Sequence, residues 1–239
     1  SRFRRAVEAG SSHVEREGGL LTFGVRPTRP ETGFGYLRIG GEHGSIGEWS
    51  VHLLAEFVEK PDLDTARRYL AEGGYLWNSG MFVWPASELL EEIRQQLPRL
   101  SDGLERVAAA WGTADAGSVV GEVYPTLPRV SVDYGVMEGA RRRWTIPVAF
   151  PWSDVGAWPA LGELLDADAD GNATRGRVVT LDCRDTVLVG DGPLVAAAGL
   201  HDLVVVATPD AVLVVPAAQA QRVKDLVAAI EDRGWDDVL

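Results

Sequence analysis

The pattern of apolar residues changes once along this chain, after Asp166, and the change limits what each part can form. Before Asp166, apolar runs of strand length alternate with segments of helical periodicity, which is typical of α/β layers on a mainly parallel sheet. After it, short apolar runs follow one another at nearly regular intervals, separated by Gly, Asp and Pro. We therefore predict an α/β domain at residues 1–168. Residues 169–239 are predicted to form a small β-rich, β-helix-like unit with a terminal helix.

Individual elements follow from the same periodicity and from Gly and Pro as breakers. In the first part we predict helices at 3–17, 62–72, 87–97 and 155–165, and strands at 20–25, 35–39, 51–59, 75–84 and 146–150. The second and third strands are expected to be joined by a turn at 40–45, and the fourth to be broken at 78–80. The apolar runs of the second part are 178–179, 187–189, 194–196, 203–206 and 212–215, and a helix follows Pro216.

Charge and cysteine content exclude several classes of protein. A net charge of −12 argues against broad binding to nucleic acid or to an anionic membrane, because both favour basic surfaces. The single cysteine, Cys183, excludes an internal disulfide framework and is compatible with a reducing cytoplasm. No apolar run approaches the length of a membrane span.

Five short stretches couple a polar or charged group to Gly, Pro or an aromatic residue, which fix the backbone path or close a pocket wall. In chain order they are Glu31-Thr32-Gly33-Phe34-Gly35-Tyr36, Phe57-Val58-Glu59-Lys60-Pro61, Trp77-Asn78-Ser79-Gly80-Met81-Phe82, Ser131-Val132-Asp133-Tyr134-Gly135-Val136-Met137-Glu138 and Trp152-Ser153-Asp154-Val155-Gly156-Ala157-Trp158.

Taken together, this set resembles the sugar-1-phosphate nucleotidyltransferases, and among them the bacterial mannose-1-phosphate guanylyltransferases, over nearly all of the chain. The resemblance implies a Rossmann-like, mixed nucleotidyltransferase sheet. It also implies a cytoplasmic enzyme that forms GDP-mannose and pyrophosphate from GTP and mannose 1-phosphate with Mg²⁺. Such a transfer needs in-line positioning and neutralised phosphate charge more than a covalent nucleophile.

Lys60 is the candidate catalytic cation, because it ends an apolar strand at the sheet edge where open α/β folds bind ligands. By resemblance, Lys60 contacts the sugar phosphate and Glu59 accepts hydrogen bonds from sugar hydroxyls. The alternative for both residues is an ion pair at the end of a strand.

Three further positions are candidates for substrate binding. Gly33 and Gly35 allow a ligand to approach the backbone closely, although their alternative role is a simple turn. Asn78 carries a donor and an acceptor suited to neighbouring sugar hydroxyls. Its alternative is a bulge that interrupts a strand.

Asp154 is the candidate magnesium ligand, since hard cations prefer carboxylate oxygen. Its alternative is the N-cap of the helix that follows. In the family a second aspartate joins this residue from a segment before residue 1. The roles of Asp133 and Glu138 stay open between helix capping, structural support and substrate contact.

The family's nucleotide loop, a Gly-rich turn running into Arg-Leu-Trp-Pro-Leu-Ser-Arg, matches none of these residues. We therefore expect the chain to be the C-terminal part of an enzyme and to be inactive alone, with a stand-alone remnant as the alternative. Rival functions are guanylyl or adenylyl transfer to another sugar 1-phosphate, and a non-catalytic sugar-phosphate-binding or regulatory subunit. The β-rich unit is expected to pack on the α/β layer and on a second copy of the chain, as a homodimer, because so small a unit buries little core alone.

Overall fold

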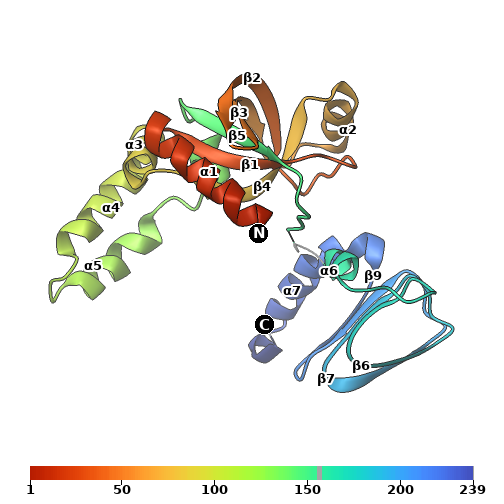
Figure 1. The fold of residues 1–239 in the computed structure, drawn as a ribbon. Helices are drawn as coiled ribbons and strands as arrows, with labels where there is room; N and C mark the ends of the chain where they lie inside the picture. Colours follow the sequence, from red (N-terminus) through yellow and green to blue (C-terminus); the bar gives the residue numbers. More distant parts are fainter. Residues whose placement is uncertain (155–157, 239) are drawn as a thin grey trace. The chain divides into compact units, whose positions relative to one another are not determined.

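A computed structural model describes residues 1–154 and 158–238 and divides the chain into two compact units, Ser1–Trp152 and Ser153–Leu239 (Figure 1). Each unit has its own hydrophobic clusters. The domain boundary that the sequence predicts, between residues 168 and 169, stays a prediction, since compactness alone assigns the segment before it to the second unit.

The first unit is built on five strands that close into a barrel in the order β1-β4-β2-β3-β5. Among the described strands of this sheet, only β1 and β5 pair in parallel. The mixed α/β sheet is confirmed, but the expectation of a mainly parallel sheet is wrong. A helix between two strands permits parallel neighbours without requiring them, and here β2 inserts between β3 and β4 and runs antiparallel to both. The bounds are β1 Leu20–Val25, β2 Tyr36–Ile46, β3 Trp49–Val58, β4 Tyr75–Val83 and β5 Arg143–Val148.

The predicted turn at residues 40–45 is wrong. These residues belong to β2, which forms a hairpin with β3. The chain turns instead at Gly47, whose φ is 59°. Glycines inside the hairpin serve close approach and bulges. A Cβ at Gly40 would lie 2.9 Å from the Leu53 carbonyl oxygen, and the register of the pair shifts on both sides of Glu42.

Helices of the first unit begin and end near the predicted residues. The helix α1 (Arg2–Glu17) ends at Gly18 with a φ of 68°. The helix α2 (Leu63–Glu72) is capped by Asp62, whose side chain accepts a hydrogen bond from the Thr65 N–H at 2.8 Å. The helix α3 (Ala86–Gln96) is followed by α4 (Pro98–Ala110) and α5 (Ala116–Val123), which were not predicted from the sequence. Both extend away from the sheet (Figure 1). A short 3₁₀ helix, η1 (Tyr124–Thr126), and a π-helical turn, η2 (Asp133–Met137), complete the unit.

Two apolar clusters hold the sheet between helices. One joins α1 to β1, β3 and β5 through Ala6, Phe23, Val51 and Ile146, all 1% exposed or less. The other packs α3 and η2 against the sheet through the buried Leu37, Leu54, Val136 and Met137. Helix α1 and the α3–η2 pair therefore cover different sets of sheet side chains.

The second unit confirms a β-helix-like fold with a terminal helix. Its four strands lie in the order β6-β7-β8-β9, and the first two neighbouring pairs are parallel while the last is antiparallel. The predicted runs 187–189 and 194–196 both belong to β7, so five runs form four strands. Cys183 is buried and unbonded to another cysteine, as expected of a core residue. The elements are α6 Trp158–Leu164, β6 Ala173–Leu181, β7 Val187–Ala198, β8 Leu203–Ala207, β9 Val212–Pro216, η3 Ala217–Arg222, α7 Val223–Glu231 and η4 Asp236–Val238.

Part of the predicted helix at 155–165, and of the stretch Trp152 to Trp158, lies outside the described residues, namely residues 155–157. The described helix begins at Trp158. Across residues 1–154 and 158–238, none of the helices has the length and apolar character that crossing a membrane requires.

Candidate functional site

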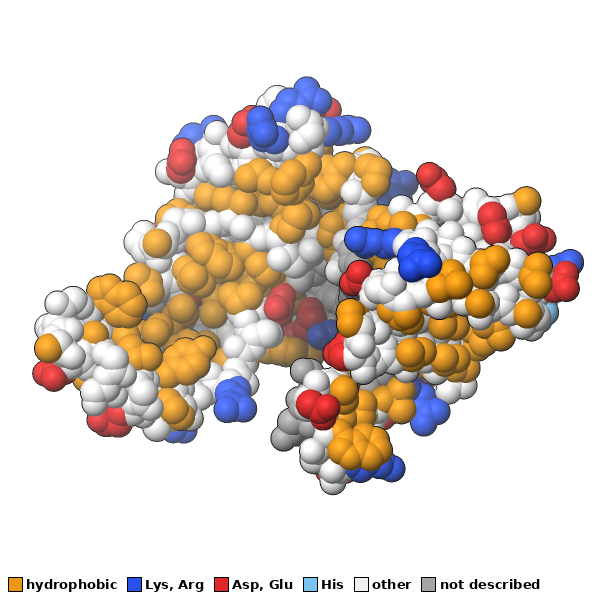
Figure 2. Space-filling model, turned by 90° about the horizontal axis from the view of Figure 1, so that it is seen from below, with side chains coloured by type: hydrophobic (Ala, Val, Ile, Leu, Met, Phe, Trp, Pro, Cys, Tyr) orange, Lys and Arg blue, Asp and Glu red, His pale blue; other side chains and the backbone are white. Residues whose placement is uncertain are grey.

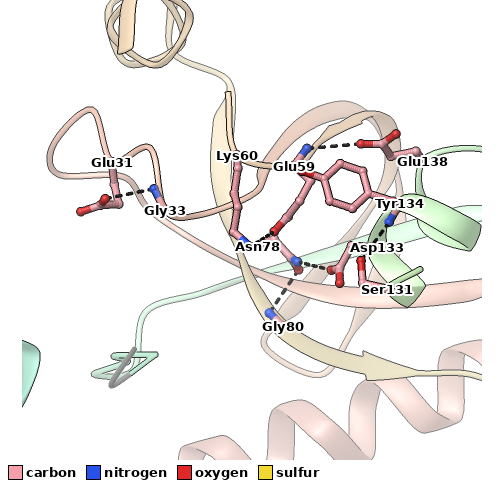
Figure 3. Close-up of polar contacts among 10 residues, drawn as sticks. All are labelled: Glu31, Gly33, Glu59, Lys60, Asn78, Gly80, Ser131, Asp133, Tyr134 and Glu138. Atoms are coloured by element: carbon pink, nitrogen blue, oxygen red, sulfur yellow. Dashed lines mark hydrogen bonds and ion pairs between the residues drawn. The ribbon is translucent and has the colours of Figure 1, made fainter. Parts of the chain in front are cut away.

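Residues from four separate stretches meet where β3 ends in the first unit (Figure 3). Glu59 and Lys60 follow β3 directly, Gly35 precedes β2, and Asn78 lies in β4. Because β2 pairs with both β3 and β4, these positions become neighbours in space. Asp133, at the start of η2, reaches the same place from the far end of the sequence.

Glu59 is the central side chain of the site, with only 11% of it exposed. Its Oε1 lies 3.5 Å from Lys60 Nζ, while its Oε2 is buried and has no hydrogen-bond partner among the described residues. Burial, followed by the nearby Asp133 carboxylate, raises the pKa of Glu59, and Lys60 opposes the shift. A buried acceptor without a donor is costly, so this oxygen is suited to a ligand that brings its own N–H or O–H.

Gly35 lies directly beside that carboxylate. A Cβ at this position would lie 2.3 Å from Glu59 Oε2 and 3.2 Å from Asn78 Cβ. The Gly35 carbonyl also accepts a hydrogen bond from Asn78 N–H at 2.8 Å. A larger residue here would displace the Glu59 carboxylate from its observed position, and contact of Gly35 with a ligand stays a prediction.

Gly33, by contrast, lies in an exposed loop. Its N–H donates to Glu31 Oε1 at 3.1 Å, and a Cβ would come no closer than 3.4 Å to any described neighbour. The loop geometry therefore explains Gly33 as part of a turn, and its contact with a ligand stays a prediction.

Asn78 is buried, with 8% exposed, and most of its amide is already engaged. Its Oδ1 accepts from the Thr22 hydroxyl at 2.9 Å and from Gly80 N–H at 3.2 Å, and its Nδ2 donates to Asp133 Oδ1 at 3.1 Å. The single proton of the Thr22 hydroxyl is shared between Asn78 Oδ1 and the Met81 carbonyl, which lies 3.1 Å from that hydroxyl. One N–H of Asn78 remains for a ligand, and its oxygen is already occupied by Gly80 N–H and in part by Thr22, whereas the sequence suggested a free donor and a free acceptor.

The predicted break of the fourth strand is wrong, whereas the alternative of a bulge at Asn78 agrees with the structure. The strand β4 runs through Asn78, Ser79 and Gly80 without interruption, but its register against β1 shifts between Thr22 and Gly24. The extra residues of β4 form a bulge there, and the bulge directs the Asn78 amide toward Thr22 and Asp133.

Lys60 has a φ of 48°, a left-handed conformation that is rare for a residue with a side chain. Such backbone strain of non-glycine residues is concentrated at functional sites. The side chain is 57% exposed and its Nζ faces Glu59, so the ammonium group is accessible to an anion in solution.

Asp154 is exposed and belongs to the second compact unit, so its part in the site stays a prediction. Within the described ranges, no cluster of three His, Cys, Asp or Glu side chains forms a ready metal site. An exposed carboxylate still fits Mg²⁺, because this ion commonly takes one or two protein carboxylates and completes its shell with phosphate and water.

The structure adds residues whose roles the sequence left open or did not suggest. Glu138 Oε1 accepts the Glu59 N–H at 3.4 Å, and Asp133 holds Asn78. The signal for both was the stretch Ser131 to Glu138, but nothing in its pattern specified these partners. Nothing in the sequence pattern around Thr22, in the middle of β1, indicated a role in the site.

Removing the charge of Glu59 is expected to stabilise the protein at neutral pH. Because the folded pKa is raised, this carboxyl contributes stability below its unfolded pKa, and that contribution is lost as the pH rises through the folded value. Glu59→Gln should therefore raise Tm at pH 7.5 by about 2 °C or more, the shift that about 1 kcal/mol produces in a chain of this size. The gain should disappear at pH 4.

Scanning calorimetry of wild type, Glu59→Gln and the exposed control Glu105→Gln at both pH values tests this expectation. A lower Tm for Glu59→Gln at pH 7.5 would show that the ion pair with Lys60 outweighs the burial of the carboxylate.

Comparison with known proteins identifies the family of this chain. Residues 2–171 match the family model described as "Nucleotidyl transferase", and the chain belongs to that family. Residues 176–230 match the model described as "MannoseP isomerase/GMP-like beta-helix domain", which agrees with the strands of the second unit.

The relatives are named for xanthan biosynthesis, alginate biosynthesis and mannose-1-phosphate guanylyl transfer. The chain is 40% identical over 236 residues to the xanthan biosynthesis protein XanB of Xanthomonas campestris pv. campestris (strain B100), covering 97% of this chain and 48% of the relative. It is 38% identical over 233 residues to the mannose-1-phosphate guanylyltransferase of Escherichia coli (strain K12), with the same two coverages. The chain thus spans about half the length of these relatives.

A solved structure from Thermus thermophilus, titled as a mannose-1-phosphate geranyltransferase, superposes with a TM-score of 0.79 at 38% identity. The match covers 96% of this chain and 65% of that one.

Proposed function

We propose that these residues form the sugar-phosphate side of a mannose-1-phosphate guanylyltransferase. The reaction joins the phosphate of mannose 1-phosphate to the α-phosphorus of GTP and releases pyrophosphate. The observation that carries the proposal is the Glu59–Lys60 pair, which presents a buried, unpartnered carboxylate oxygen beside an accessible ammonium group. A sugar phosphate matches both, since its hydroxyls donate hydrogen bonds and its phosphate requires a cation. The name of the Escherichia coli relative supports the choice of sugar and base.

Each residue has a defined task in this proposal. Lys60 binds the incoming phosphate, and Glu59 accepts a hydroxyl of the sugar. Gly35 leaves room for the ligand beside the carboxylate, and the remaining N–H of Asn78 donates to a second hydroxyl. Asp154 would hold Mg²⁺, which neutralises phosphate charge when bound. The buried, unpaired thiol of Cys183 is compatible with a cytoplasmic location.

The test is an assay of the complete gene product with mannose 1-phosphate, GTP and Mg²⁺, in which GDP-mannose and pyrophosphate are both measured. Parallel reactions with ATP or UTP, and with glucose 1-phosphate, define the base and the sugar. GDP-mannose formation supports the proposal. Preferred turnover of another sugar 1-phosphate would contradict the assignment to mannose, and binding without transfer would favour a regulatory subunit.

We also propose that the second unit joins two copies of the chain as a homodimer. Its strands expose Val179, Leu181, Leu194, Val212 and Val214, each at least 50% accessible. Hydrophobic side chains are visible on the surface of this unit, on the right of Figure 2. Five exposed apolar side chains in three strands of so small a unit favour burial against another protein surface.

Sedimentation velocity is expected to show a dimer for wild type and a shift toward monomer for the double variant Val212→Glu, Val214→Glu. Arg222→Glu, an exposed change on η3, serves as the charge control. If neither the double variant nor deletion of the β-rich unit alters the oligomeric state, the proposed interface is wrong.

A further inference from the structure

We propose that Asp133 is a positioning residue of this site, which fixes the amide of Asn78 with its free N–H toward the ligand and sets the charge environment of Glu59. The identity of the ligand rests on the function proposed above. The arrangement of these side chains stands on the contacts of the first unit alone (Figure 3).

The Asn78 amide has one favourable orientation. In the observed orientation Oδ1 accepts from Thr22 and Gly80, and Nδ2 donates to Asp133. A flipped amide would direct N–H groups at the Gly80 N–H and an oxygen at the Asp133 carboxylate. Asp133 is the partner that penalises the flip most strongly, because it is an acceptor of full negative charge.

Asp133 belongs to a turn that is anchored by packing and hydrogen bonds. It begins η2, in which Gly135, Val136 and Met137 are buried. The Gln96 side chain donates to the Val136 carbonyl at 3.1 Å, and Arg143 Nη1 donates to the Met137 carbonyl at 2.9 Å. A π-helical turn is an uncommon backbone form that is frequent at functional sites.

The turn η2 contacts the site at both of its ends. Asp133, at its start, binds Asn78, and Glu138, directly after it, accepts the Glu59 N–H. The turn therefore connects the residue that follows β3 to the middle of β4 independently of the sheet. A displacement of η2 would move both ligand-facing groups together.

Asp133 also acts on Glu59 electrostatically. The charged groups that act on Glu59 are Lys60 on its own segment and Asp133 and Glu138 from η2. The two carboxylates raise the pKa of Glu59 and add to the effect of burial, whereas Lys60 lowers it. Asp133→Asn removes one negative charge while keeping an oxygen that can accept from Asn78. The pKa of Glu59 should fall in this variant, which a purely structural role for Asp133 would not produce.

The experiment has two independent readouts on the 239-residue chain. Carbon-13 NMR of labelled glutamate carboxyls follows the titration of Glu59, assigned by its loss in Glu59→Gln. Calorimetry measures the binding of mannose 1-phosphate. The variants are Asp133→Asn, Asp133→Ala and the control Asp102→Asn, which removes a charge from an exposed position of α4.

Both Asp133 variants should titrate Glu59 at lower pH than wild type. Asp133→Ala should weaken mannose 1-phosphate binding about tenfold, the effect of losing a hydrogen bond to a charged group, and Asp133→Asn should weaken it less. Asp102→Asn should match wild type in both readouts. Asp133→Asn keeps the hydrogen bond, so it tests the charge effect even if Asp133→Ala fails to fold.

The outcomes separate the two proposals. If wild type fails to bind mannose 1-phosphate while the Glu59 titration shifts as expected, the proposed ligand is wrong and the control of Glu59 by Asp133 is supported. If wild type binds and Asp133→Asn behaves like Asp102→Asn in the titration, the positioning proposal is overturned.

Discussion

Replacing Lys60 with alanine in the complete enzyme is expected to lower kcat/KM for mannose 1-phosphate about a hundredfold. A preorganised cation on a reacting phosphate is typically worth roughly 3 kcal/mol, and each 1.36 kcal/mol is about tenfold in rate. Lys60 would meet phosphate charge in the ground state and in the transition state, so KM should rise and kcat should fall. Tm should change little, because the side chain is 57% exposed.

Steady-state kinetics at saturating GTP separate the two effects. Lys224→Ala, which replaces the other lysine of the chain at an exposed position on α7, is the matched control. Lys60→Arg keeps the charge and should recover part of the activity. A value of kcat/KM within about twofold of wild type for Lys60→Ala would mean that this residue only forms an ion pair with Glu59.

Replacing Asp154 with asparagine is expected to cause a defect that depends on magnesium. The amide keeps the shape of the side chain but lacks the negative charge that favours a divalent cation. Activity should therefore be at least about tenfold below wild type at low Mg²⁺ and should approach wild type as the Mg²⁺ concentration rises. The exposed position of Asp154 predicts little change in Tm.

The decisive measurement is initial rate against Mg²⁺ concentration for wild type, Asp154→Asn and the control Asp166→Asn, an exposed aspartate of the same unit. Wild-type activity of Asp154→Asn at low Mg²⁺ would assign Asp154 to helix capping. A defect that high Mg²⁺ does not relieve would indicate a direct contact with substrate.

Several elements could be predicted from the sequence because their determinants are local. The ends of α1 and α2 coincide with Gly18 and Gly73, which adopt φ values of 68° and 70° that side chains disfavour. Asp62 caps α2 as its position before the apolar periodicity predicts. The apolar runs of the second part became strands, because a run of strand length bounded by turn residues has few other ways to bury its side chains.

Strand pairing and turn position depended on tertiary structure. The glycines at 40–44 have the same local signal as a turn, yet they lie in β2, where β3 pairs with them through an irregular register. Parallel or antiparallel pairing was likewise decided by which strands β2 inserts between. These choices concern partners distant in sequence, and no short pattern encodes them.

For the candidate site, the sequence by itself determined the residue types that carry chemistry, namely the Glu59–Lys60 pair, the glycine at 35 and the amide at 78. Only the tertiary structure decided how they act. Folding removed Glu59 Oε2 from water without giving it a partner among the described residues, and it placed the Asn78 oxygen against the Thr22 hydroxyl and the Gly80 N–H. It also brought Asp133 to Asn78 across 55 residues. Burial, hydrogen-bond saturation and like-charge proximity are properties of atoms in space, so they arise only when distant segments pack together.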